Sequence, residues 1–320
     1  MVVLLTIASG RTWTSSDGRT LEGEFVRAEG EVAVVNVKGR ILRIPFASLS
    51  EEDVAFVKAA ATKVEAGTNQ LFGTELKAGA LIDADEFLSD SMKELLAASD
   101  FEPSKVKVRV WTPQGFDPAQ PQKVLWMVGS HDNEAERRKG NIGMFMRGQA
   151  AQENGWIVIA ADTNMGNPRR SITQTSEADA EFHYFIIEKM EEAWPGFRGW
   201  KHACAGHSTG AQAVFFRLAQ LMKAQCRVVG GFFSGCNKGM VRLASQETGV
   251  RSGDWRRIKA FQSSGDQDRL VDERDIKSVG EDLKRGGVKE IRSKTFAGNH
   301  TMNEELFLEA LAWFIEEKKE

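Results

Sequence analysis

The sequence predicts an α/β protein in which helices cover both faces of a mostly parallel sheet, preceded by a small β-barrel. Three observations support this class. From about residue 105, strand-like and helix-like apolar patterns alternate, whereas residues 11–57 hold short alternating runs between turn signals. The composition, 42% hydrophobic and 27% charged, is that of an ordinary globular protein. A length of 320 residues fits about two domains.

Charge and hydropathy exclude two classes of partner. Lys and Arg number 42 against 45 Asp and Glu, a net charge of −3, so no cationic excess favours nucleic acid. No apolar run approaches the ~18–20 residues that a membrane span requires. The three cysteines, Cys204, Cys226 and Cys236, are too few for a disulfide framework, and we expect buried free thiols.

The N-terminus resembles the tail of a signal peptide. Val2 to Ile7 is mostly apolar, and the small residues Ala8 to Gly10 follow. This pattern predicts export to the periplasm or the exterior. The alternative is a first strand or a truncated start on a cytoplasmic protein, because the segment is short and lacks a positive region.

Turn signals divide residues 11–57 into short elements. Asp17-Gly18 is a strong hairpin signal. Strands are predicted at Leu21–Val26, Val32–Val37 and Ile41–Ile44, and Ser48 to Asp53 opens a helix with a serine cap and an acidic first turn. The pattern predicts a small β-barrel closed by a helix.

Over about 45 residues this region resembles the SH3-like homology domain 1 of endocytic clathrin adaptors. The residues that carry the resemblance are Arg11 to Thr14, Asp17 to Arg19, Glu24-Phe25, Ile44-Pro45 and Leu49 to Asp53. The resemblance implies a peptide or protein ligand. Because no His or Cys lies between Arg11 and Phe56, the region supplies no activated nucleophile with its base, and we expect a separable recognition module.

A mostly helical connection is predicted over residues 58–104, with Ser89–Ala98 as its clearest amphipathic piece. Beyond it, strands are predicted at Val106–Trp111, Val124–Val128, Trp156–Ala161, Lys201–Ala205, Val228–Phe233, Ile258–Gln262 and Ile291–Thr295. The predicted helices are Ile142–Glu153, Ala178–Ala193, Ala211–Ala224, Glu273–Arg285 and Glu304–Glu317. In such sheets ligands bind at the carboxyl ends of the strands.

One such strand end carries the motif G-x-S-x-G at residues 206–210. It follows a predicted strand and opens a predicted helix, which is the context of a nucleophile elbow with Ser208 at its tip. The glycines let the turn tighten without Cβ clashes. An ordinary glycine-rich turn is the alternative; a dinucleotide-binding turn lacks its G-x-G-x-x-G pattern here.

An acid and a base follow in chain order. Asp268, after the sixth of these strands, fits a Gly265-x-x-Asp268-x-x-Val271 spacing, and Asp266 in the same loop is the runner-up. His300 follows the last strand. The order Ser208, Asp268, His300 predicts a triad in which His300 takes the serine proton and Asp268 fixes the imidazole tautomer.

The other four histidines are assigned lesser roles. His202 begins a strand and belongs at the opposite edge of the sheet, and His183 lies within a helix, where a solvated or structural role is expected. His207, the variable position of the motif, is expected to shape the substrate site, and His131 follows a strand and is a candidate substrate contact.

Two backbone N–H groups are needed for an oxyanion hole. Thr209, at a helix N-terminus directly after the nucleophile, is one candidate. The second belongs to the loop after Val124–Val128, with Ser130 or His131 as donor.

Residues 105–320 resemble the α/β-hydrolase superfamily, and within it compact esterases, feruloyl esterases and polyester depolymerases. The segment Asn237–Arg257 is too short for a large lid. Trp255 within it is a candidate for stacking on a substrate ring or a packing anchor. Arg169 and Arg170 could hold a substrate carboxylate or sulfate, or form a solvated basic pair.

These residues together predict a serine hydrolase that cleaves a small-molecule or polymer-linked carboxylic ester through an acyl-enzyme. No metal-ligand spacing or phosphate loop is present, so no cofactor or metal is expected. The alternatives are a serine peptidase of the same fold and a catalytically silent binding protein that works through its N-terminal barrel.

Overall fold

A computed structural model of the chain describes residues 11–29, 31–37, 40–62, 70–84, 87–99, 101–130, 133–162 and 177–316. The chain divides into two compact units, Met1–Gly67 and Thr68–Glu320. Val2 to Gly10 lie outside the described residues, so export stays a prediction. No helix in the described ranges has both the length and the apolarity to cross a bilayer.

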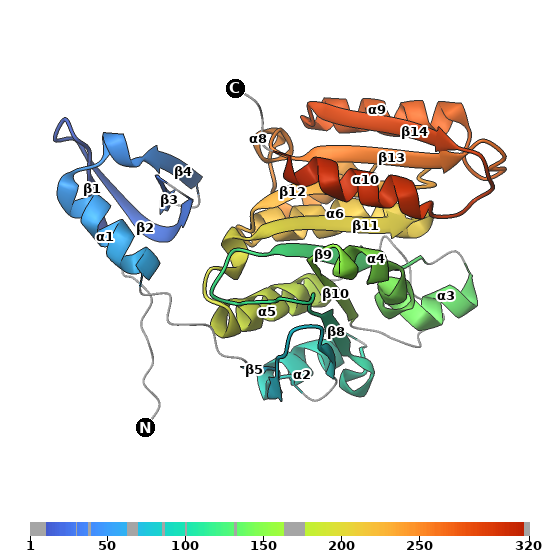
Figure 1. Ribbon diagram of the computed structural model, residues 1–320, viewed down its shortest axis with the longest axis horizontal. Coiled ribbons are helices and arrows are strands. Elements are labelled where there is room, and N and C mark those ends of the chain that lie inside the picture. Colours follow the sequence, from blue (N-terminus) through green and yellow to red (C-terminus); the bar gives the residue numbers. More distant parts are fainter. Residues whose placement is uncertain are drawn as a thin grey trace. The chain divides into compact units, whose positions relative to one another are not determined.

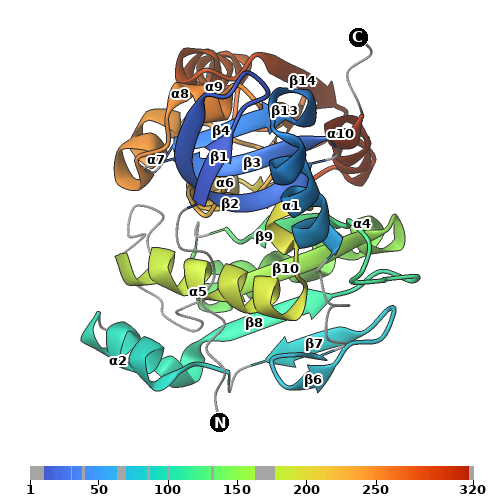
Figure 2. The same cartoon turned by 90° about the vertical axis from the view of Figure 1, so that its left-hand side faces the viewer.

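The first unit is an antiparallel meander with one helix. Its strands pair in chain order: β1 (Arg11–Thr14), β2 (Thr20–Glu29), β3 (Val32–Val37) and β4 (Arg40–Pro45). The short 3₁₀ helix η1 (Phe46–Ser48) and α1 (Glu51–Thr62) follow, and Figure 2 shows α1 beside the strands. Gly18 has the positive φ of 85° that its hairpin needs, and Ser50 Oγ caps α1 by accepting from Asp53 N at 3.2 Å. Closure into an SH3-like barrel stays a prediction.

The core of this unit is small and separate. Trp13, Ala33, Val35, Leu49 and Val57 are buried together, and Trp13 Nε1 donates to Gly23 O at 3.0 Å. Because the large tryptophan finds both apolar contacts and an acceptor, it can be fully buried at little polar cost. The first unit therefore has a hydrophobic core of its own.

The second unit is built on an eight-stranded sheet (Figure 1). In spatial order its strands are β14 (Glu290–Phe296), β13 (Lys259–Gly265), β12 (Val228–Ser234), β11 (Lys201–His207), β9 (Lys123–Val128), β10 (Trp156–Asp162), β8 (Lys107–Trp111) and β7 (Leu81–Ala84). β8 pairs antiparallel with both β10 and β7, and the other strand pairs described in this sheet are parallel. The predicted α/β class and mostly parallel sheet are confirmed.

Helices cover both faces of this sheet. The core of one face takes in residues of α2 (Asp90–Ala98), α5 (Glu177–Ala193), α6 (Thr209–Lys223), α7 (Val241–Thr248), α8 (Ser252–Trp255) and α9 (Glu273–Gly286). The core of the other face takes in η3 (Gly140–Gly148), α4 (Gln149–Glu153) and α10 (Glu304–Ile315). The remaining elements are β5 (Gln70–Leu71), β6 (Thr74–Glu75), η2 (Pro103–Lys105), α3 (Glu134–Lys139) and η4 (Phe197–Gly199).

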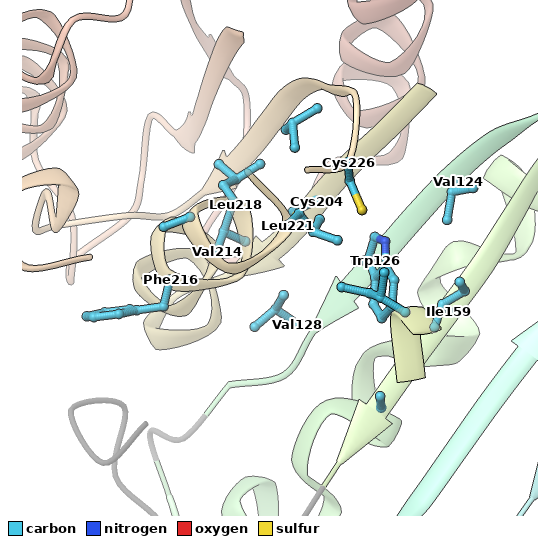
Figure 3. Packing of buried hydrophobic residues seen from close by; sticks show 14 of the residues in the cluster. Val124, Trp126, Val128, Ile159, Cys204, Val214, Phe216, Leu218, Leu221 and Cys226 are labelled. Atoms are coloured by element: carbon cyan, nitrogen blue, oxygen red, sulfur yellow. The ribbon is translucent and has the colours of Figure 1, made fainter. Parts of the chain in front are cut away.

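Side chains of β9 alternate between the two cores. Val124, Trp126 and Val128 belong to the core shared with α6, whereas Leu125 and Met127 belong to the opposite one. Figure 3 shows the strand residues opposite the apolar face of α6. The predicted continuous apolar strands are explained, because both faces of each central strand are buried.

Two sequence expectations need correction. The described part of residues 58–104 is not mostly helical, because β5, β6 and β7 lie in it and β7 pairs with β8 in the large sheet (Figure 2). The helix expected over Ile142–Glu153 is a 3₁₀ helix, η3, followed by the short α4. This segment packs tightly on β10, because a Cβ at Gly148 would lie 2.5 Å from Val158 Cγ1.

Candidate active site

The turn from β11 to α6 presents Ser208 in a strained conformation. Its φ of 57° and ψ of −127° are unusual for a residue with a side chain. A Cβ at Gly206 would lie 2.4 Å from Gly210 O, and one at Gly210 would lie 2.7 Å from Val128 O, so both positions require glycine. Ser208 N donates to Ser234 O at 2.8 Å. The close backbone contacts at Gly206 and Gly210, together with the hydrogen bond from Ser208 N, therefore hold the serine in its strained conformation.

The imidazole of His300 lies against this serine. His300 follows β14, and its Nε2 is 2.8 Å from Ser208 Oγ. Gly235, with φ 56°, makes room for the ring, because a Cβ there would lie 2.8 Å from His300 Cε1. A side chain at position 235 would displace the histidine.

Asp268 completes a chain of three side chains. Its Oδ2 lies 2.7 Å from His300 Nδ1, and its Oδ1 accepts from Leu270 N at 2.8 Å and Val271 N at 3.1 Å. The Asp268 side chain is 1% exposed, against 19% for His300. These backbone N–H groups compensate the burial of the Asp268 carboxyl group.

Asp266, the runner-up from the sequence, serves a different contact. Its Oδ1 accepts from Gly298 N at 2.9 Å, and its own N–H donates to Phe296 O at 2.9 Å. It therefore holds the loop that carries His300 and does not touch the imidazole. The structure places Asp268, not Asp266, beside His300.

The hydrogen bonds fix where the protons lie. A carboxylate oxygen only accepts, so the His300 tautomer that fits Asp268 carries its proton on Nδ1 and donates to Oδ2. Its Nε2 is then an acceptor, and Ser208 Oγ donates to it. This arrangement lets the serine lose its proton to His300 as its oxygen forms a bond.

Comparisons with known proteins give a likeness to solved esterase structures. No protein-family model and no curated protein matches the chain. Thermogutta terrifontis esterase 2 phosphorylated by paraoxon is 13% identical, covers 65% of this chain and 86% of its own, and has a TM-score of 0.45. A ferulic acid esterase is 15% identical to this chain, with a TM-score of 0.46. The match covers 74% of this chain and 96% of the ferulic acid esterase. A Pyrococcus furiosus esterase is 14% identical over 65% and 84%, with a TM-score of 0.41.

The loop after β9 is anchored beside the elbow by residues that the sequence analysis missed. Gly129 N donates to Asn141 Oδ1 at 3.0 Å, while Asn141 Nδ2 donates to Ala161 O at 2.7 Å. Asn141 N donates to the buried Asp162 at 2.6 Å. The amide of Gly129 is thus engaged away from the elbow. A lone Asn in a glycine-rich stretch carried no sequence signal for this role.

The two candidate oxyanion residues lie side by side. Ser130 Oγ is 3.1 Å from Thr209 Oγ1, although 79 residues separate them in sequence. Ser130 Oγ also donates to Glu136 Oε2 at 2.6 Å. His131, the other candidate donor and a predicted substrate contact, lies outside the described residues, as does Arg169.

His207 lies in the site, and Trp255 does not. The His207 ring centroid is 4.5 Å from that of His300, and its Nδ1 is 3.1 Å from Ser234 Oγ. Trp255 is 0% exposed in the core and donates from Nε1 to Ser245 Oγ at 2.9 Å. Its expected stacking on substrate is therefore wrong, because a fully buried indole cannot reach a ligand.

The remaining histidines are structural. His202 is buried, accepts on Nδ1 from Trp126 Nε1 at 3.2 Å, and donates from Nε2 to Phe197 O at 2.8 Å. His183 is buried within α5, with Nδ1 2.7 Å from Asp179 O, so the solvated role is excluded and the structural one fits.

The cysteines and the carboxylates form no second reactive centre in the part of the chain that the structure describes. Cys204, Cys226 and Cys236 are buried and form no disulfide. Burial raises the pKa of Cys204 and raises that of Cys236 to about 12. No group of three His, Cys, Asp or Glu among the described residues is arranged as a metal site.

Proposed function

We propose that this protein is a serine hydrolase of the α/β-hydrolase fold that cleaves carboxylic esters through an acyl-enzyme. The observation that carries the proposal is the continuous chain from Ser208 Oγ to His300 Nε2 at 2.8 Å and from His300 Nδ1 to Asp268 Oδ2 at 2.7 Å. Nucleophile, base and orienting acid are the parts of a catalytic triad. All three follow strand ends of one sheet.

In the proposed reaction Ser208 Oγ attacks the ester carbonyl while its proton moves to His300 Nε2. Asp268 keeps the imidazole in the tautomer that can accept this proton and stabilises the resulting imidazolium. His300 then protonates the leaving alkoxide, and the alcohol departs. A water molecule, deprotonated by His300, attacks the acyl-enzyme and releases the carboxylic acid with Ser208 restored.

Backbone N–H groups at Thr209 and in the Ser130 segment are the proposed oxyanion donors. Thr209 opens the 15-residue helix α6, so the positive end of the helix dipole faces the developing charge. The amides of Ser208 and Gly129 donate to Ser234 O and Asn141 Oδ1. Because these two amides are already engaged, the proposed donors are the amides of the next residues, Thr209 after Ser208 and Ser130 after Gly129.

A fluorophosphonate probe and p-nitrophenyl esters of increasing chain length test the proposal. We expect the probe to label the protein, and Ser208→Ala to abolish labelling and lower ester turnover about 10³–10⁶-fold. Ser252→Ala, at an exposed serine of α8, is the matched control and should behave as the parent. Undiminished labelling of Ser208→Ala would remove the serine mechanism.

The same acyl group presented as a p-nitroanilide separates an esterase from a peptidase. An esterase should cleave the ester far faster than the anilide, whereas a peptidase should cleave the anilide with a comparable kcat/KM. A catalytically silent binding protein would cleave neither and would not be labelled.

We further propose that the first unit is a separable module that binds a peptide or protein. Its own buried core, Trp13 with Val57 and their neighbours, supports independent folding. In the chain beginning at Thr68, kcat/KM on a small ester should stay within tenfold of the full chain. A larger loss in a folded product would exceed about 1.4 kcal/mol of transition-state stabilisation and contradict separability.

A further inference from the structure

Two hydroxyls and a carboxylate form a hydrogen-bonded chain beside Ser208. Thr209 Oγ1 is 3.1 Å from Ser130 Oγ, and Ser130 Oγ is 2.6 Å from Glu136 Oε2. The three residues belong to α6, to the loop after β9 and to α3. Ser130 is 8% exposed, so its hydroxyl is held in a largely dry position.

The carboxylate sets the direction of every bond in this chain. Ser130 Oγ donates to Glu136 Oε2, so its single proton points to this carboxyl oxygen. Ser130 Oγ can then only accept from Thr209, and the Thr209 hydroxyl proton points to Ser130. Both hydroxyl protons are thereby directed away from the reacting centre. The two hydroxyls cannot act as oxyanion donors while this chain is intact.

The chain bridges the two segments that must share an oxyanion. On one side, Gly129 N is fixed by Asn141, and a Cβ at Gly210 would lie 2.9 Å from Gly129 O, so the two backbones are already in close contact. On the other side, Ser130 Oγ lies 3.1 Å from Thr209 Oγ1 in the first turn of α6, within hydrogen-bond distance. Backbone packing and the hydroxyl chain together fix the spacing between the amides of residues 130 and 209.

We propose that Glu136 is a positioning residue for the oxyanion site, acting through Ser130 and Thr209. This inference rests on the proposed serine hydrolase function. Donors in a preorganised site need correct placement more than additional strength, and small displacements cost rate. The carboxylate orients the two hydroxyls, and these hold the loop after β9 against the first turn of α6.

Steady-state kinetics on one p-nitrophenyl ester test this, beginning with the parent and Ser208→Ala. If the parent hydrolyses the ester and Ser208→Ala does not, the proposed function is supported independently of the positioning role of Glu136. If the parent shows none, the proposed function fails and the positioning role falls with it. With the parent active, the variants below test the positioning role alone.

Glu136→Ala and the isosteric Thr209→Val each break one link, and Ser130→Ala breaks both. We expect each to lower kcat about tenfold with KM within twofold, because the lost alignment acts on the transition state. A trifluoromethyl ketone forms an adduct that carries the same oxyanion. Its inhibition constant should therefore rise in each variant by about the factor by which kcat falls. Glu136→Gln, which keeps an acceptor oxygen, should lose less than Glu136→Ala.

The double variant Ser130→Ala with Thr209→Val tests whether the hydroxyls act as one unit. We expect its kcat to match either single variant, about tenfold below the parent, and not to fall about 100-fold. Glu134→Ala, an exposed carboxylate in the same turn of α3, is the matched control for charge and helix stability and should retain the parental kcat.

Four results would overturn the inference. The first is single variants with kcat within twofold of the parent. The second is a raised KM at constant kcat, since that would make these side chains substrate contacts. The third is multiplicative losses in the double variant, and the fourth is unchanged inhibition by the ketone. Thr209→Val keeps the shape of the side chain, so the question stays answerable if another variant fails to fold.

Discussion

A histidine lies at each end of strand β11, buried His202 at one end and part-buried His300 at the other, and the two differ in the partners of their hydrogen bonds. At the amino end, His202 accepts from an indole N–H and donates to a backbone carbonyl. Beyond the carboxyl end, His300 lies between a carboxylate and the hydroxyl of Ser208. The partners of His202 cannot exchange a proton with it, whereas those of His300 can.

This difference teaches that burial of a histidine is not by itself a sign of chemistry. Trp126 Nε1–H and Phe197 O fix one neutral tautomer of His202 and make it a structural bridge. In the proposed mechanism, the carboxylate of Asp268 stabilises the charged form of His300, and Ser208 supplies the proton. The partners decide the role.

The largest expected effect sharpens the comparison within the acid loop. Asp268→Asn should lower ester turnover by up to ~10⁴-fold, because an amide can favour the wrong His300 tautomer. Asp266→Asn should cost less than tenfold, since an amide oxygen can still accept from Gly298 N. Measuring kcat for both variants decides the assignment. The reverse order of effects would transfer the orienting role to Asp266.

A change at the amino end should affect stability and leave catalysis alone. His202→Phe removes the acceptor of the buried Trp126 Nε1 and the donor to Phe197 O, at a cost of about 1–3 kcal/mol. Urea denaturation should show this loss. Turnover per folded molecule should stay within twofold of the parent. A tenfold lower kcat at full folding would break the distinction between the two ends.

The smallest effect concerns the thiols near the site. Cys236 follows Gly235, which contacts the His300 ring, but burial raises the pKa of its thiol to about 12. At pH 8 only about one part in ten thousand would be thiolate, the reactive form. Iodoacetamide should therefore leave ester hydrolysis unchanged, with modification of all three cysteines only in denaturant. Rapid modification of Cys236 in the native protein would contradict its burial.

Long apolar runs made most of the large sheet predictable. Seven strands of the second unit were found from the sequence, and the central ones show continuous hydrophobic stretches because both of their faces are buried. Strand β7 was missed because it has four residues, of which only Ile82 is fully buried. Its pairing with β8 depends on residues some 26 positions away, such as Arg109 with Asp83.

The candidate site was predictable where single residues follow strand ends and not where contacts join distant loops. Ser208 and His300 stand directly after strands that the sequence marks. The sequence could not decide between Asp266 and Asp268, because they lie two residues apart in the same loop and the conformation of that loop determines which one faces His300. Glu136 and Asn141 gave no signal, because their partners are defined only by the three-dimensional approach of separate loops.

The position of β7 has a practical consequence for dividing the chain. β7 hydrogen-bonds to β8, and its Asp83 accepts from Arg109, which holds the pKa of Asp83 below its usual value. A chain cut at residue 105 would strip this short, charged strand from β8 and leave a row of unpaired N–H and C=O groups. Such an exposed edge recruits other strands and promotes aggregation. A cut at Thr68 keeps the sheet border protected.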